Sequence, residues 1–199
     1  MKRIGVLISI FCLIYISCFS QKKEPLEDKL LIVLDIQEYY ANNKLSEGSA
    51  QKLIDSVNYV ISKTNPNNVI YIKSIHKLLN LSLSYPFVFV THDSAAMVFD
   101  KRLKIVNNQI FTKEESNTFT SKGLNVFLKE KNAKEIIIIG LMAEQCVYKS
   151  LIAGKNLGYD MYAIPGAIIG ETPKSKDKVM RELINEGIRI IDINILSNQ

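Results

Sequence analysis

The sequence contains few cysteines, glycines and prolines, and each shortage excludes a class of protein. Three of the 199 residues are cysteines, two of them Cys12 and Cys18, so the chain cannot be a disulfide scaffold. Nine glycines and five prolines, beside 23% charged residues, exclude collagen-like, low-complexity and wholly disordered chains. The length suits one domain with a sizeable core, or at most two small ones.

Residues 1–20 have the pattern of an export signal. Lys2 and Arg3 supply the positive start, and an uncharged apolar run over residues 4–16 follows them. At about 1.5 Å per residue this run is short for a hydrocarbon core of about 30 Å, so an uncleaved membrane anchor is the weakest reading. We predict a signal peptide over 1–20, a short polar linker over 21–28, and an exported chain.

Two ways of processing this signal stay open. Small side chains at Cys18 and Ser20 permit cleavage before Gln21, which would leave the chain periplasmic or secreted. Alternatively, Ser17 and Cys18 resemble the end of a lipobox, although Tyr15 fits poorly at its usual leucine position. In that case an acylated Cys18 would anchor the chain to a bacterial membrane.

The basicity of the chain belongs partly to this signal. The net charge is +5, and without Lys2 and Arg3 the 23 remaining basic residues face 20 acidic ones, which leaves +3. Beyond the signal, lysine and glutamate alternate as on a solvated surface, without a basic cluster interleaved with aromatics. We therefore expect no nucleic-acid partner, and contact with a membrane only through a lipid on Cys18.

From residue 29 the chain alternates strand-like and helix-like segments, which is typical of an α/β domain. The apolar runs are rich in β-branched residues, as in strands of a parallel sheet that is covered on both faces. We predict a three-layer α/β/α, Rossmann-like domain over 29–199, with a mostly parallel sheet of about six strands. The expected strands are 30–34, 69–72, 87–90, 136–139, 159–164 and 188–191, and the expected helices are 46–63, 121–131, 144–157 and 174–186.

The carboxyl ends of these strands are the places to look for chemistry, because reactive residues of such sheets gather there. The rule selects Asp35, the pair His92–Asp93 and residues 140–146. Asp35 stands where a nucleotide-binding domain would carry Gly-x-Gly-x-x-Gly, so that function lacks support.

Cys146 lies near the start of a predicted helix, where free N–H groups and the helix dipole favour a thiolate and can hold an oxyanion. A small buried hydrophobe is the alternative for a lone cysteine. Asp35 could equally cap a loop, and Lys113 taken alone is typical of a surface lysine.

Three stretches of the sequence, taken together, bear on the choice between these catalytic and structural roles. Residues 31–37 (LIVLDIQ), 111–119 (FTKEESNTF) and 140–147 (GLMAEQCV) are similar, in order and spacing, to the motifs of the isochorismatase-like cysteine hydrolases. This superfamily includes nicotinamidases and N-carbamoylsarcosine amidase. The resemblance continues through 153–167 and covers almost the whole chain after the signal.

The resemblance implies a catalytic triad of Asp35, Lys113 and Cys146. In the family's mechanism the aspartate takes the thiol proton, the lysine supports the charges, and the cysteine attacks a carbonyl carbon to form a thioester. Backbone N–H groups near Met142 and Cys146, in the loop that contains Leu141, Met142 and Ala143, would hold the oxyanion, and the family's non-proline cis peptide maps onto Leu141–Met142.

The resemblance also suggests substrate contacts. Gln37 matches the glutamine that follows the family's aspartate by two residues. Tyr40 and Phe119, with Tyr39, could form an aromatic wall over a flat substrate, and core packing is the equal alternative for them. Asn117 and Thr118 replace the usual Ser-Ala, and Lys122 stands where threonine is common, which leaves substrate preference open.

Metal and cofactor are not expected. Metal-binding nicotinamidases carry an Asp-x-His pair and a further histidine, whereas this chain has His76 and His92 and no Asp-x-His. For His92 with Asp93, hydrogen bonding within a loop is favoured over a place in the pocket. The family's frequent dimers and tetramers suggest a homo-oligomer.

Retention of Cys146 favours amide hydrolysis over cleavage of the isochorismate vinyl ether, because members with the latter activity commonly lack the cysteine. The substrate would then be a small-molecule amide. A thiol hydrolase of esters or other activated carbonyls is one alternative. A catalytically silent binding protein of the cell envelope on the same fold is the other.

Overall fold

The computed structural model describes Leu26 and residues 28–198, so the predicted signal peptide and most of the linker lie outside the described residues. Six strands form one sheet in the order β5-β2-β1-β6-β7-β8, and all neighbouring strands are parallel. The predicted α/β architecture with a parallel six-stranded sheet is therefore confirmed. The strands are β1 Leu30–Leu34, β2 Val69–Ser74, β5 Ile110–Lys113, β6 Glu135–Gly140, β7 Asp160–Ile168 and β8 Arg189–Ile190.

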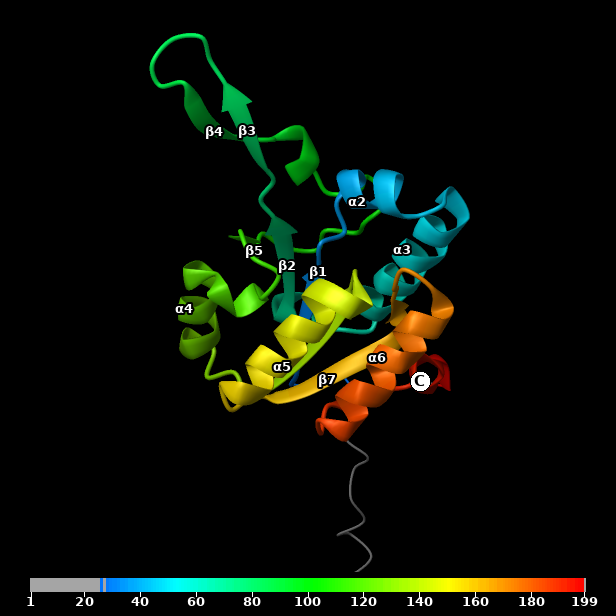
Figure 1. Ribbon diagram of the computed structural model, residues 1–199. Helices are drawn as coiled ribbons and strands as arrows, with labels where there is room; N and C mark the ends of the chain where they lie inside the picture. The colour runs from blue at the N-terminus through cyan, green and yellow to red at the C-terminus, as the bar shows by residue number, and fades with distance from the viewer. Residues whose placement is uncertain (1–25, 27, 199) are drawn as a thin grey trace, which may run out of the picture.

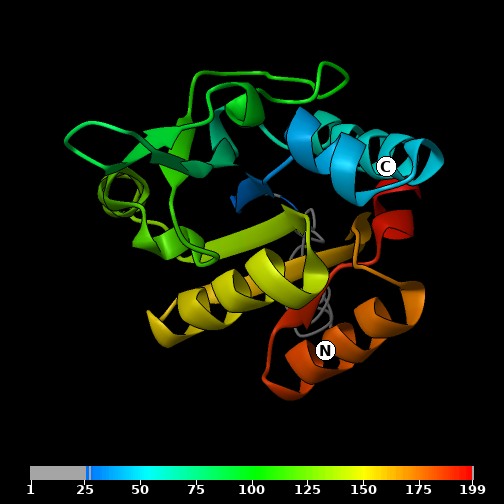
Figure 2. The ribbon, with the colours of Figure 1, turned by 45° about the horizontal axis from the view of Figure 1, so that its top comes forward.

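Helices lie on both faces of this sheet and make three layers (Figures 1 and 2). One face carries α3 Glu47–Ser62, with α2 Glu38–Lys44 beside it, and the other carries α4 Lys122–Glu130, α5 Tyr148–Asn156 and α6 Pro173–Asn185. A parallel sheet needs this cover because apolar side chains project from both of its faces. In the described part of the chain, no helix combines the length and the apolar character that crossing a membrane requires.

The central strands form the core. Leu31 of β1 lies opposite Val69 of β2 and Ile137 of β6, and all three side chains are fully buried. Leu26 is also buried and belongs to the same apolar cluster, so the described core includes one residue of the segment 21–28 that the sequence assigns to the linker.

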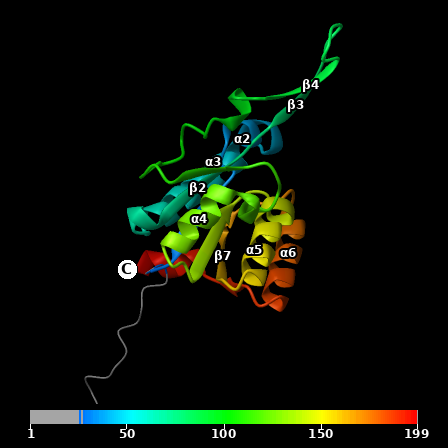
Figure 3. The same cartoon turned by 90° about the vertical axis from the view of Figure 1, so that its left-hand side faces the viewer.

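One predicted strand of the sheet is wrong. The run 87–90 does not enter the main sheet but forms β4 Val88–His92, which pairs antiparallel with β3 Lys77–Leu81 in a separate two-stranded ribbon. Figure 3 shows this hairpin projecting from the body. Only residues 82–87 join its two strands, and a parallel pairing would need a crossover of a dozen residues or more. The place at the sheet edge is taken by β5, which lies next to β2.

The remaining differences are local. The expected helix 144–157 begins as a short π-helix over Ala143–Val147 and continues as α5. Gly158 follows the end of α5 with a φ of +92°, a left-handed conformation that glycine commonly supplies after a helix. α2 was not expected from the sequence.

Candidate active site

Four strands place candidate residues at their carboxyl ends, which all lie along one edge of the sheet, the edge where the parallel strands end. Asp35 follows β1, Ser74 ends β2, Lys113 ends β5, and the loop from Gly140 to Cys146 follows β6. Because parallel strands all point the same way, their carboxyl ends share this edge. The strand order brings the four positions side by side although up to 111 residues separate them.

The backbone at this edge has two special positions. Asp35 has a φ of +59°, a conformation that aspartate tolerates better than most residues and that turns the chain out of β1. Gly140 has a φ of +120°, and a Cβ built on it would lie 2.1 Å from the carbonyl oxygen of Leu34. The loop that carries Cys146 can therefore approach Asp35 so closely only with glycine at 140.

The three residues that the sequence predicts as a triad lie in contact. Lys113 Nζ is 2.9 Å from Asp35 Oδ2 and donates a hydrogen bond to Cys146 Sγ at 3.3 Å. The side chains of Asp35 and Lys113 are almost completely buried, whereas Cys146 is partly exposed. Burial of an ion pair costs desolvation energy, which only close contact between the two charges can offset. Here the two charged groups are in close contact, and the partly exposed thiol of Cys146 lies beside them.

Ser74 is a fourth member of this cluster, and it was missed from the sequence. Its hydroxyl accepts a hydrogen bond from Lys113 Nζ at 2.7 Å and donates one to Asp35 Oδ1 at 2.9 Å. It thus links the carboxylate and the ammonium group a second time. The rule that selected Asp35 could have found it, because Ser74 is the polar residue that ends the second strand.

Gln37 is not brought to the cavity, contrary to the expected contact with substrate. Its side chain is fully buried, and its Oε1 accepts from the backbone N–H of Ser74 at 2.6 Å. Its Nε2 donates to the carbonyl oxygens of Ser74 at 3.1 Å and Ala96 at 2.6 Å. The amide of Gln37 therefore clamps the backbone of Ser74 and fixes the hydroxyl that holds Asp35.

Burial and the neighbouring Asp35 carboxylate raise the pKa of Cys146 to about 11, and Lys113 opposes this shift only in part. This shift opposes the preference for thiolate that the sequence predicts. Desolvation of the sulfur is its largest cause. The resting thiol is protonated at neutral pH, and a base must remove its proton.

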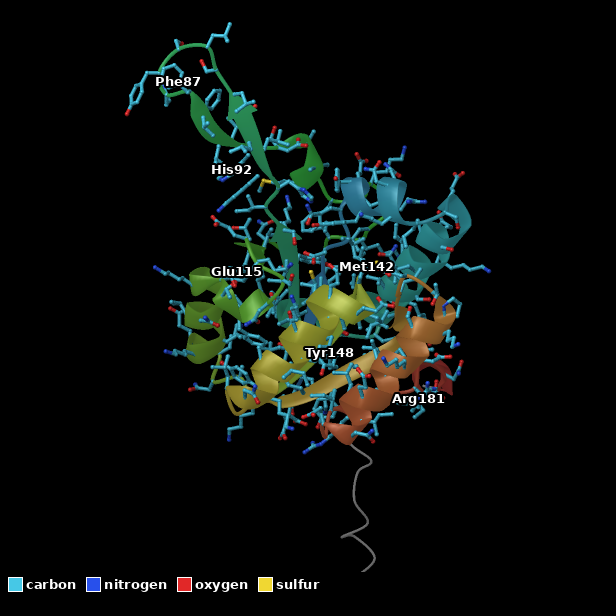
Figure 4. The ribbon with its side chains drawn as sticks, viewed as in Figure 1. Phe87, His92, Glu115, Met142, Tyr148 and Arg181 are labelled. Atoms are coloured by element: carbon cyan, nitrogen blue, oxygen red, sulfur yellow. The ribbon has the colours of Figure 1, made fainter. Side chains whose placement is uncertain are left out.

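The cluster lies at the wall of a cavity of about 160 Å³, smaller than the sites of drug-sized ligands. Figure 4 shows Met142 on the loop after β6 and Glu115 on the segment after β5. The cavity is lined by Asp35, Tyr40, Ser74, Ile75, Lys113, Glu114, Glu115, Ser116, Leu141, Met142, Gln145 and Cys146.

The predicted aromatic wall is only partly present. Tyr40 lines the cavity, and its hydroxyl shares a hydrogen bond of 3.0 Å with His76 Nε2. Burial raises the pKa of Tyr40 to about 12, so this hydroxyl stays neutral. Phe119 lies outside the cavity, buried and stacked on Tyr159 at 5.6 Å between ring centroids, which is the core-packing alternative.

The loop after β6 has the predicted cis peptide bond between Leu141 and Met142. Leu141 and Met142 both line the cavity. Ala143 is fully buried, and its backbone N–H donates to the carbonyl oxygen of Ile169 at 2.9 Å, so this N–H group is not available to a substrate.

The pair His92–Asp93 lies at the root of the hairpin and not at the sheet edge. His92 is exposed, and Asp93 Oδ1 accepts from the backbone N–H groups of Ala95 and Ala96 at 3.1 and 3.2 Å. This agrees with the predicted role in a loop. Among the described residues, no group of three or more His, Cys, Asp and Glu side chains comes together as a metal site would require. The described residues therefore do not offer the three or four protein ligands that a zinc centre uses.

A larger cavity of about 440 Å³ lies between the starts of α3 and α6. Its lining includes Lys44, Ser46, Glu171, Lys176 and Asp177 but no cysteine. We place the candidate active site in the smaller cavity, because a nucleophile, a carboxylate and a buried lysine meet there.

Comparison with known proteins agrees with this fold. A sequence model described as "Isochorismatase domain" matches residues 29–195. The secreted isochorismatase effector Isc1 of Verticillium dahliae is 22% identical over 142 residues, which cover 71% of this chain and 73% of the relative. The isochorismatase family protein YrdC of Bacillus subtilis is 26% identical over 144 residues, which cover 71% of this chain and 73% of the relative.

Among solved structures, the pyrazinamidase of Pyrococcus horikoshii in complex with zinc is similar, with a TM-score of 0.66 and 20% sequence identity. The match covers 83% of this chain and 99% of the pyrazinamidase chain. At this identity the likeness concerns the fold, and the chemistry must be argued from the residues of this chain.

Proposed function

The chain belongs to the isochorismatase family of hydrolases, and from this premise we propose that it is a cysteine amidohydrolase that cleaves the C–N bond of a small amide. The observation that carries the proposal is the position of Lys113 Nζ, 2.9 Å from Asp35 Oδ2 and 3.3 Å from Cys146 Sγ, at one cavity wall. A nucleophile, a base and a fixed cation within contact distance are the parts that acyl transfer needs.

In the first half of the reaction Asp35 takes the proton of the Cys146 thiol while the sulfur attacks the amide carbon. A base is required because the pKa of this thiol is raised to about 11. Lys113 stabilises the thiolate as it forms, and its amino group is already in position because it donates to Ser74 and pairs with Asp35. The tetrahedral intermediate then expels the amine or ammonia, which takes the proton from Asp35, and a thioester remains on Cys146.

In the second half a water molecule attacks the thioester carbon and gives its proton to Asp35. The C–S bond breaks, the acid leaves, and the proton returns to the sulfur, which restores the resting thiol. We assign the oxyanion to the backbone N–H groups of Met142 and Cys146, since the N–H of Ala143 already donates to Ile169.

The cavity limits the substrate. Its volume of about 160 Å³ favours a small amide, and Ile75, Leu141 and Met142 give it apolar walls. The neutral hydroxyl of Tyr40 can donate or accept a hydrogen bond at the mouth, and the carboxylates of Glu114 and Glu115 line the same cavity. These carboxylates disfavour an anionic substrate.

We also propose that the chain acts outside the cytoplasm. The proposal is supported by Lys2, Arg3 and the apolar run 4–16, and by the similarity to a relative that is described as secreted.

The test is ammonia release from a panel of small neutral amides. We expect turnover by the purified chain, a loss of at least about 10⁴-fold in Cys146→Ala, and a loss of about 10²–10⁴-fold in Asp35→Asn. Val126→Ala is the matched control, because this side chain is exposed on α4 and does not line the cavity.

The two alternative functions, a thiol esterase and a silent binding protein, predict different results. Ester turnover that depends on Cys146, without ammonia from any amide, would identify a thiol esterase. Tight binding of an amide that stays intact over hours would identify a silent binding protein and contradict the proposal.

A further inference from the structure

The hairpin that replaces the predicted third sheet strand has an unusual surface. We call residues 77–92 the arm. Nine large apolar side chains of the arm are exposed, with relative exposures from 40% for Phe89 to 104% for Leu83. Figure 4 shows Phe87 near its outer end and His92 at its root. The nine are Leu78, Leu79, Leu81, Leu83, Tyr85, Phe87, Val88, Phe89 and Val90.

The arm lacks the usual protection of an exposed ribbon. Residues 78–91 include no Asp, Glu, Lys or Arg, although soluble proteins commonly place such charges on free strand edges. β3 pairs only with β4 in the described structure, so the outer edges of both strands are open. A two-stranded hairpin is marginally stable alone in water, and exposed apolar patches of this size mark interaction sites.

The two faces of the arm differ. Leu79 pairs with Val90 and Leu81 with Val88, so one face is aliphatic beyond the Lys77–His92 pair at its root. Leu78 pairs with Thr91 and Asn80 with Phe89 on the opposite face, where Asn80 Nδ2 donates to Thr91 Oγ1 at 2.8 Å. The side chains of the aliphatic face are between 53% and 81% exposed, more than Leu78 and Phe89 of the other face.

We propose that the aliphatic face and tip of the arm dock on the same surface of a second copy of this chain and form a two-fold dimer. A two-fold contact requires a surface that is complementary to itself, and an uncharged aliphatic ribbon meets this requirement. It carries no charge by which a charged partner would be selected.

The area of the patch supports a stable dimer. Its seven side chains are Leu79, Leu81, Val88 and Val90 with Leu83, Tyr85 and Phe87 of the tip. At roughly 150–200 Å² per large side chain, their exposed fractions correspond to an area on the order of 800–1,000 Å². A standard protein interface buries about 800 Å² per partner.

The position of the arm argues against a lipid surface as its partner. The arm rises from the carboxyl end of β2, whereas the chain enters the domain at Leu26, beside the amino end of β1. Figure 1 shows the arm and the start of β1 toward opposite ends of the molecule. The arm and the described start of the domain therefore lie on opposite sides of the body.

The arm also bears on the cavity, because Ile75 and His76 join it to Ser74. Lys77 at its root forms an ion pair with Glu114, which lines the cavity.

The test uses two differently tagged full chains that are expressed together. We expect each tag to recover the other, and light scattering to give the mass of two chains at tens of micromolar protein. Leu79→Glu with Leu81→Glu should reduce the recovered partner at least tenfold. The matched control is Val126→Glu with Leu157→Glu, which places the same charges on side chains of 56% and 59% exposure on the body.

Thermal unfolding checks that each variant folds, and Leu79→Ser with Leu81→Ser replaces the glutamate pair if that variant does not. Persistence of the pair in the folded arm variants would overturn the proposal. A monomeric wild-type chain would overturn it as well, and sedimentation of that monomer with neutral phospholipid vesicles would identify a lipid surface as the partner instead.

Discussion

Strand β6 and the arm strand β4 are built from the same kinds of side chain and lie in opposite surroundings. The four isoleucines 136–139 of β6 are fully buried, whereas every residue of β4 is exposed. β6 has β1 and β7 as neighbours and is packed by α3, whereas β4 has one neighbour, β3. An apolar β-branched run thus favours a strand, but the connections of the chain decide whether that strand is buried.

The two regions also differ in what they hold. The end of β6 leads into the loop of Cys146, where buried side chains fix one another through a lysine, a carboxylate and a hydroxyl. The arm offers an apolar surface and no such cluster. The site and the arm are joined at Ser74, the last residue of β2. Its hydroxyl donates to Asp35 in the site, and the chain after Ser74 continues into the arm.

The largest effect is expected at the end of β6. Gly140→Ala places a Cβ where it would lie 2.1 Å from the carbonyl oxygen of Leu34, at a φ of +120° that side chains rarely adopt. We expect it to lower the free energy of unfolding by at least about 4 kcal/mol. Urea denaturation measures this, with Gly48→Ala in the first turn of α3 as the control, where a Cβ meets nothing within 4 Å. Equal stabilities of the two variants would contradict the close approach of the loop to β1.

A pair of truncations tests the comparison directly. Ile138→Ala in β6 should cost about 2–5 kcal/mol, because it removes buried methylene groups from a packed core. Val88→Ala in β4 should change the stability of the body by less than about 0.5 kcal/mol, because its side chain is 53% exposed. Urea denaturation at low protein concentration compares them, and a cost above about 2 kcal/mol for Val88→Ala would show that the arm packs on the body.

The sequence could predict the elements whose pattern is local. The strands around β1 and β6, the helices α3 to α6 and the positions of Asp35, Lys113 and Cys146 all follow from motifs or periodicity. β5 was not predicted, because Ile110–Lys113 is short and half polar, and run 87–90 took its place since its composition is that of a buried strand.

Contacts between distant residues could not be predicted. Its place at the end of a strand could have selected Ser74 as a candidate, but only the folded sheet puts it between Asp35 and Lys113, and Gln37 contacts it across 37 positions of sequence. The raised pKa of Cys146 has the same origin, because burial and the nearness of Asp35 are properties of the folded site.

Ser74→Ala tests the junction of the two regions. It removes one hydrogen bond from a buried carboxylate and one from a buried ammonium group, which should lower kcat about 10–100-fold on the amide identified by the panel. KM should change less than about threefold, because Ser74 acts on Asp35 and Lys113 and serves here as a positioning residue. Steady-state kinetics measure both constants.

Ser84→Ala is the control for this substitution, since Ser84 is an exposed serine of the arm. Ser74→Thr keeps a hydroxyl and should restore part of the lost kcat. An unchanged kcat in Ser74→Ala would mean that the ion pair of Asp35 and Lys113 is held without the serine.

The smallest effect concerns the reactivity of two thiols, one in each region. Leu83→Cys introduces a thiol at a fully exposed position of the arm, and we expect iodoacetamide to modify it faster than Cys146 in the same molecule at pH 8. The reason is that burial and Asp35 raise the pKa of Cys146 to about 11, so little thiolate is present below that pH. The rate at Cys146 should therefore rise about tenfold for each pH unit until pH approaches 11.

Alkylation of the Asp35→Asn variant tests whether the Asp35 carboxylate contributes to the raised pKa of Cys146. Loss of the carboxylate removes one cause of the raised pKa of Cys146 and leaves Lys113, which lowers that pKa. At pH 8 the variant should thus alkylate at Cys146 about tenfold faster for each unit by which the pKa falls, while its amide turnover decreases. Peptide mass spectrometry follows the two thiols separately, and the one introduced on the arm should react at an unchanged rate. Slower alkylation of Cys146 in Asp35→Asn would mean that the resting cluster already holds a thiolate, with the proton on Asp35.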